Sequence, residues 1–139
     1  MNAWNVTGPS TVGALDARTG RRLWAATLTA STQEPAISGN AIYASTANGA
    51  VALNARTGAR LWESAEIEGN PGMLFAADGI ICGNTSTPQA VLTGATALDA
   101  ATGQRMWSYR LADGVSSIAL DAGRLLAADN SGALYALRA

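Results

Sequence analysis

Histidine and lysine are absent from this sequence, and cysteine occurs once, as Cys82. These absences remove the usual general base, the amine nucleophile and any internal disulfide. No run of about 18 apolar residues occurs, so no membrane span is predicted. The first residues, Met1 to Trp4, lack the basic and apolar regions of a signal peptide. A formal net charge of −1 gives no electrostatic reason to expect binding to nucleic acid or to an anionic membrane.

What the sequence does contain is a repeat. The pattern Ala-x-Asp/Asn-x-x-Thr-Gly-x-x-x-Trp occupies residues 14–24, 52–62 and 97–107, and it begins again at 136–139. The leucines that mark the four copies are 38, 45 and 39 residues apart. A period near 40, with short strand patterns, Gly-rich turns and no helical periodicity, indicates four-stranded blades of a β-propeller. An apolar fraction of 48% is sufficient for a packed core.

The chemistry of the pattern fits a hairpin turn. The Asp or Asn oxygen can accept bonds from backbone N–H groups two or three residues on, and the Gly allows a positive φ. The Trp would then lie in the seam between neighbouring blades. Because Asn54 takes the place of Asp16 and Asp99, the charge is dispensable, which suits a turn cap and not a metal ligand or a general base. The predicted structural residues are Asp16, Thr19, Gly20, Trp24, Asn54, Thr57, Gly58, Trp62, Asp99, Thr102, Gly103 and Trp107.

This pattern resembles the tryptophan-docking motif of the quinoprotein-type, or PQQ-like, β-propeller repeat family. The resemblance covers the chain nearly end to end. It implies a bacterial protein of the periplasm or the cell exterior. The family includes quinone-dependent dehydrogenases, which hold PQQ and a metal ion on the propeller axis. It also includes outer-membrane assembly lipoproteins and sensor domains of kinases, which have no catalytic role of their own.

The repeats divide the chain at approximately 1–28, 29–66, 67–111 and 112–139. We expect three strands in the first repeat, including Trp4 to Thr7, then four, four and three. Trp4 could instead end a preceding motif, in which case Met1 to Val6 would be an outer strand of another blade. The third repeat carries about seven extra residues between Asn84 and Gly94, which predict a longer polar loop.

About fourteen strands make about three and a half blades, which leaves apolar faces and strand edges open. We therefore expect self-association, in which two copies join head to tail and close a ring of about seven blades. Another protein is a further candidate partner. The alternative is that the chain is a fragment or an engineered piece of a longer propeller.

The functional hypothesis is a non-catalytic scaffold for protein association, without cofactor or metal. Cys82 lies in an apolar stretch and is expected to be a small buried hydrophobe. The one carboxylate cluster, Glu63, Glu66 and Glu68, alternates with other residues as on the solvent face of an outer strand. Two alternatives stay open: a fragment of a PQQ-dependent dehydrogenase, and a designed or excised set of repeats without a selected function.

Overall fold

The computed structural model of the protein describes residues 10–28, 35–46, 49–67, 74–86, 92–110, 117–121 and 124–138. Within these ranges all the regular secondary structure is β-strand, so the all-β expectation is confirmed. No helix long and apolar enough to cross a bilayer occurs in the same ranges. The strand predicted at Trp4 to Thr7 lies outside them.

The strands form four antiparallel sheets whose order follows the chain. The first sheet contains β1 (Ser10–Leu15) and β2 (Arg22–Leu28). The second contains β3 (Ala36–Ser38), β4 (Ala41–Thr46), β5 (Gly49–Asn54) and β6 (Arg60–Ser64). The third contains β7 (Leu74–Ala77), β8 (Ile80–Ser86), β9 (Leu92–Asp99) and β10 (Arg105–Arg110). The fourth contains β11 (Ser117–Asp121), β12 (Arg124–Ala128) and β13 (Leu134–Arg138).

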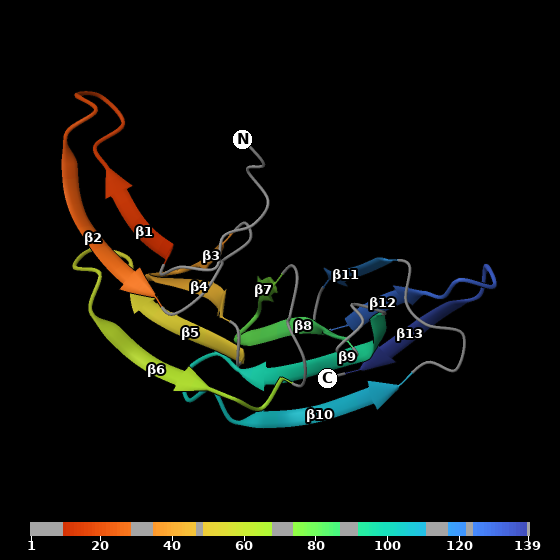
Figure 1. Cartoon of the computed structure of the whole chain (residues 1–139). Coiled ribbons are helices and arrows are strands. Elements are labelled where there is room, and N and C mark those ends of the chain that lie inside the picture. Colours follow the sequence, from red (N-terminus) through yellow and green to blue (C-terminus); the bar gives the residue numbers. More distant parts are fainter. Residues whose placement is uncertain are drawn as a thin grey trace, which may run out of the picture.

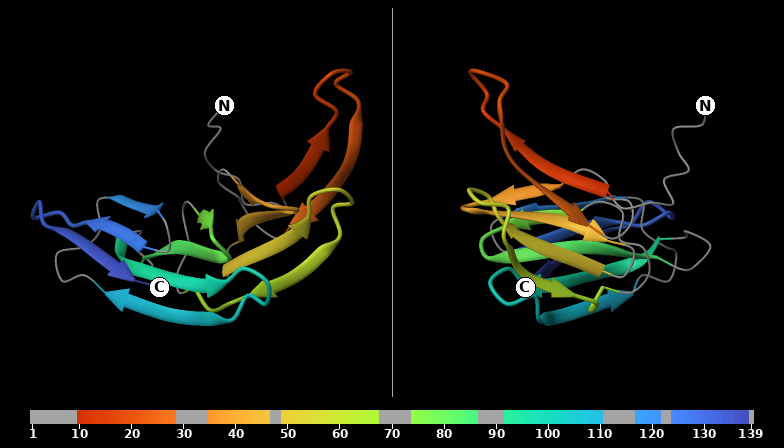
Figure 2. Two further views of the ribbon diagram at one scale, coloured as in Figure 1. Left: turned by 180° about the vertical axis from the view of Figure 1, so that it is seen from behind. Right: turned by 60° about the vertical axis from the view of Figure 1, so that its left-hand side comes forward.

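The four sheets stand side by side in an open arc (Figure 1). The short strands β3, β7 and β11 line its inner side, where β7 contacts both β3 and β11. The strands β2, β6 and β10 follow its convex side, as the view from behind also shows (Figure 2). The two complete sheets therefore have the four-stranded blade pattern that the repeat spacing predicts.

The core consists of three apolar layers, one between each pair of neighbouring sheets. Alternate residues of a strand point to opposite faces, so each of the two middle sheets contributes to two layers. On β5, Ala50 and Ala52 pack toward the third sheet, whereas Val51 and Leu53 pack toward the first. All four are at most 1% exposed. The alternating small and large residues that predicted this strand thus fill both of its faces.

Two local features show where sequence reasoning succeeded and where it failed. The Asp78-Gly79 turn between β7 and β8 has positive φ at both residues, 52° and 77°, as in a type I′ hairpin. The extra residues of the third repeat were predicted as a loop, and this is wrong for their described part. Thr85 and Ser86 of that predicted loop belong to β8, and Ser86 pairs with Leu92, so β8 is one residue longer than β4 and β9 is two residues longer than β5. The reason is physical, since strand pairing satisfies backbone groups that a loop leaves to water.

Candidate functional site

The side chain that begins each repeated turn is occupied by the turn itself. Oδ1 of Asp16 accepts hydrogen bonds from the backbone N–H groups of Arg18 and Thr19, both at 2.9 Å, and from the Thr19 hydroxyl at 3.1 Å. Asp99 accepts the equivalent three bonds at 3.0–3.1 Å. The bonds from Thr19 and Arg18 lower the pKa of Asp16, because they stabilise its carboxylate form. At Asn54 the amide oxygen accepts the two backbone bonds.

A β-bulge follows each turn, and the sequence reasoning missed it. In the second sheet Leu53 pairs with Arg60 while Ala52 pairs with Trp62, so Leu61 has no partner in the ladder. Leu23 and Met106 occupy the same position in the first and third sheets. All three bulge residues are about half exposed, at 54%, 53% and 48% for Leu23, Leu61 and Met106. A large apolar residue directly before each Trp was the available signal.

The indoles of Trp24 and Trp62 lie against the turn of the next sheet. Trp24 Nε1 donates to the carbonyl of Ala55 at 3.0 Å, and Trp62 Nε1 donates to that of Ala100 at 2.9 Å. The rings cover Gly58 and Gly103, where an added Cβ would lie 2.5 and 2.6 Å from a ring carbon. Both glycines have φ of +75°, so the turn needs glycine for its backbone and for its lack of a side chain.

The third indole is placed differently. Trp107 packs beside the layer between the third and fourth sheets. Its Nε1 is buried and has no hydrogen-bond partner among the described residues. At the turn position of the fourth repeat stands Arg138, which pairs with Arg124 as Asp99 pairs with Ile80. Gly20, at the other end of the arc, is uncovered, because a Cβ added there would have no atom within 4 Å.

A cleft of about 500 Å³ opens between the second and third sheets. Tyr43, Asn54, Leu61 and Asp99 are among its lining residues. Partial burial, and secondarily the charge of Asp99, raise the pKa of Tyr43. Its phenol therefore stays protonated and available as a donor. The cleft was not predicted, because it depends on how two sheets are spaced and not on a motif.

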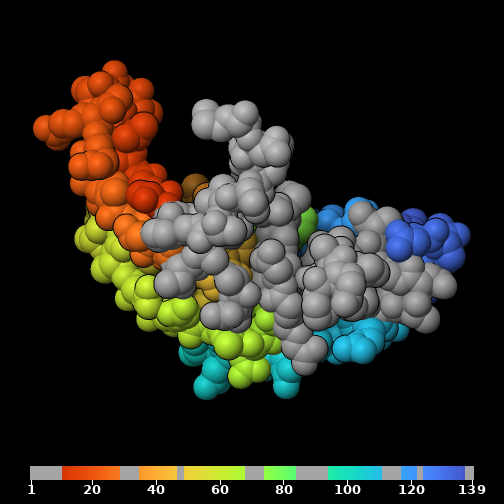
Figure 3. Space-filling view, in the orientation of Figure 1, coloured from red at the N-terminus to blue at the C-terminus, as the bar shows by residue number. Residues whose placement is uncertain are grey.

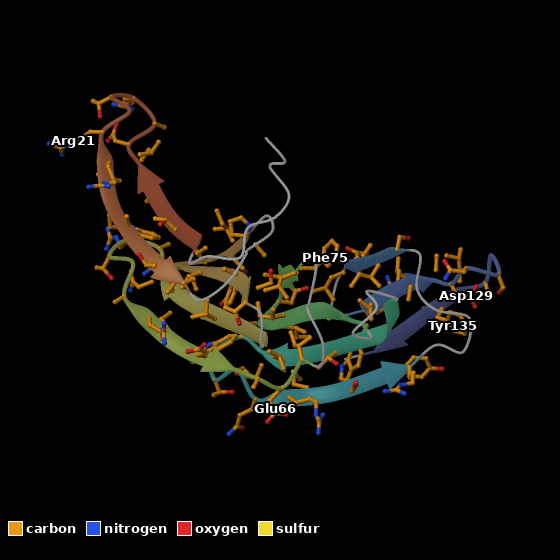
Figure 4. The ribbon with its side chains drawn as sticks, viewed as in Figure 1. Arg21, Glu66, Phe75, Asp129 and Tyr135 are labelled. Carbon is orange, nitrogen blue, oxygen red and sulfur yellow. The ribbon has the colours of Figure 1, made fainter. Side chains whose placement is uncertain are left out.

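The carboxylates and the thiol are held in structural roles. Glu63 pairs with Arg60 at 2.8 Å, and Glu66 pairs with Arg105 at 3.8 Å, with all four side chains well exposed. Figure 4 shows Glu66 on the convex side of the arc. Glu68 lies outside the described residues. Burial raises the pKa of Cys82 to about 12, which keeps the thiol protonated.

Asp129, between β12 and β13, is 4% exposed and holds its own hairpin. Its Oδ1 accepts bonds from the backbone N–H groups of Ser131 and Ala133, both at 2.9 Å. Its Oδ2 accepts the Tyr135 hydroxyl at 3.0 Å, and Figure 4 shows the two side chains near each other at this end of the arc. In the described part of the chain no three His, Cys, Asp or Glu side chains gather as metal ligands.

Residues 6–109 match the family model described as outer membrane protein assembly factor BamB. The chain belongs to this PQQ-like repeat family. A search of curated proteins finds no match.

Solved structures with the same fold include BamB from Moraxella catarrhalis, with a TM-score of 0.74 and 22% identity over 93% of this chain and 39% of that one. The computationally designed Ika4 protein gives a TM-score of 0.74 and 14% identity over 92% of this chain and 79% of that one. The dihydro-heme d1 dehydrogenase NirN gives a TM-score of 0.62 and 16% identity over 95% of this chain and 33% of that one. The chain thus spans well under half of these two natural proteins, and at such identities the likeness shows the fold alone.

Proposed function

We propose that this chain is a non-catalytic scaffold that associates with proteins through the open faces of its sheet array. The observation that carries the proposal is the exposure, on the two end sheets, of large apolar side chains at positions whose counterparts in the two middle sheets are buried. Leu15 in the first sheet is 64% exposed and Leu134 in the fourth is 81% exposed. Exposed apolar surface of this kind is typical of protein interaction sites. The description of the family as an assembly factor is consistent with this role.

The turn residues favour a structural over a catalytic role. The Oδ1 atoms of Asp16 and Asp99 are each engaged by two backbone N–H groups and a hydroxyl. They are therefore poorly suited to bind a metal ion or to accept a proton from a substrate. The described residues do not fit the PQQ and metal centre of the dehydrogenases in the family, because no three His, Cys, Asp or Glu side chains among them gather to hold a metal ion.

The partner that we favour is a second copy of the chain, joined head to tail. Multi-angle light scattering over a range of concentrations tests this self-association, with an expected mass of twice 14.1 kDa. A folded monomer at every concentration would contradict it. Addition of PQQ with Ca²⁺ should leave the melting temperature unchanged, whereas a rise would favour the dehydrogenase alternative, since a tight ligand stabilises the folded state.

A further inference from the structure

The two sheet-to-sheet interfaces at the second sheet are built from equivalent positions. In each pair of neighbouring sheets we call the one that comes first in the sequence the leading sheet and the other the following sheet. On the leading sheet, the strand before the turn presents small residues, such as Ala50 and Ala52 of β5, beside the Trp. On the following sheet, the same strand presents a leucine toward them, such as Leu98 of β9. Leu53 of β5 takes this second role toward the first sheet. Each of the two complete sheets therefore has a leading face and a following face, which differ in composition.

The end sheets leave one face of each kind uncovered. Leu15 has the same register position as Leu53 and Leu98, opposite the arginine that begins the outer strand. Leu53 and Leu98 are 1% and 0% exposed, but Leu15 is 64% exposed. The first sheet packs on the second through Val12, on its other face. The first sheet thus presents an open following face, which contains Leu15.

The fourth sheet presents the complementary open face. By strand register, Leu134 corresponds to Ala50 and Ala95, and Leu126 corresponds to Tyr43 and Cys82. The four corresponding residues are at most 5% exposed, whereas Leu134 is 81% exposed and Leu126 is 42% exposed. The fourth sheet packs on the third through Ile118, Leu125 and Ala127. Its other face, with Leu126 and Leu134, is an open leading face.

The two open faces lie at opposite ends of the arc (Figure 1), and in the space-filling view the β1–β2 hairpin and the β12–β13 hairpin mark these ends (Figure 3). We propose that the leading face of the fourth sheet, with Leu126 and Leu134, docks on the following face of the first sheet, with Leu15, in a second copy of this chain. This proposal rests on the proposed scaffold function and names its partner and its surface. The contact continues, between copies, the interface that neighbouring sheets make within one copy.

The contact is heterologous, because a different surface of each copy takes part. The described part of the fourth sheet has no outer strand, so no described indole repeats the contact of Trp24 and Trp62 at this interface. Gly20 remains open for the same reason. The interface consequently depends on its apolar faces, and we expect it to dissociate on dilution.

Complementation between two variants tests the interface. Leu15→Arg and Leu134→Arg each place a guanidinium in the apolar contact, and each should weaken self-association by about a hundredfold or more, because a buried charge is left unpaired. Both leucines are exposed in the single copy, so both variants should keep the folded circular dichroism spectrum. Met106→Arg is the matched control, since Met106 is also about half exposed but lies in the third sheet. It should associate like the unmodified chain.

An equimolar mixture of the two variants is the decisive sample. One intact pair of faces remains, the first sheet of the Leu134→Arg chain and the fourth sheet of the Leu15→Arg chain, so the mixture should form a dimer that neither variant forms alone. Dimers that persist in both separate variants would overturn this interface and leave the scaffold role standing. Failure of the mixture to associate would overturn the head-to-tail arrangement. A monomeric unmodified chain at all concentrations would contradict both the interface and self-association.

Discussion

A methyl group added at Gly103 tests whether the indole contact holds neighbouring sheets together. A Cβ added at Gly103 would lie 2.6 Å from a ring carbon of Trp62, whereas ordinary contacts are about 3.4–4 Å. Gly103→Ala therefore forces the ring to move by roughly 1 Å. Such a shift breaks or stretches the 2.9 Å hydrogen bond from Trp62 to the carbonyl of Ala100. A lost hydrogen bond of this kind costs about 1 kcal/mol, and the disturbed packing adds a similar amount.

The chain supplies a matched control at Gly20. Its φ is +71°, nearly the +75° of Gly103, but a Cβ added at Gly20 would have no atom within 4 Å. Gly20→Ala should therefore lower the free energy of unfolding only through backbone strain, by about 1–2 kcal/mol for a residue forced into the left-handed region. Gly103→Ala should cost this amount and about 1–3 kcal/mol more, from the displaced indole.

Urea unfolding followed by circular dichroism gives both free energies of unfolding. The measurements should be made at a dilution where each chain is monomeric, so that association does not contribute. If the two variants are equally destabilised, the indole does not rest on Gly103 in the folded protein. A second check is Trp62→Ala, which should cost less in the Gly103→Ala background than in the unmodified chain, because the two groups interact.

Two further predictions concern titratable groups. Hydrogen bonds lower the folded pKa of Asp16 and of Asp129, so each carboxylate stabilises the fold above its unfolded pKa of about 4, and this contribution is lost as the pH falls through the folded pKa. The melting temperature should thus decrease as the pH is lowered below about 4. The Asp16→Asn variant keeps an acceptor oxygen, as Asn54 does, and its melting temperature should decrease less over the same pH range. An equal decrease would contradict the assignment. Because burial raises the pKa of Cys82 to about 12, a thiol reagent at pH 8 should label it only after denaturant is added, and rapid labelling of the folded chain would count against its burial.

The sequence predicted the strands well because they follow from local patterns. Alternation in β5 and the Asp-Gly dipeptide before β8 each specify a strand or turn without reference to distant residues. The extension of β8 through Ser86 could not be read in the same way, because Thr85 and Ser86 are polar residues whose pairing partners come from the other side of the insertion. The bulge at Leu61 was missed for a similar reason, since it appears only when two strands are aligned.

The recurring turn residues were visible in the sequence, whereas the open sheet faces were not. Asp16, Asn54 and Asp99 stood out in the sequence because they recur, and their oxygens are in fact engaged by the turns that they begin. The open faces could not be seen in this way, because Leu15 has the same sequence surroundings as the buried Leu53 and Leu98. What distinguishes Leu15 is that no described sheet packs on its face, which is a property of the assembled arc.

This contrast indicates where function should be sought in a chain of repeats. The recurring Trp24 and Trp62 each have a partner in the next sheet and are thereby used for stability. The surface free to bind belongs to residues in equivalent positions that have lost that partner. Leu134, exposed where Ala50 and Ala95 are buried, is also larger than either of them. A larger apolar side chain at an open position offers more area to a partner, which is the property that an association surface requires.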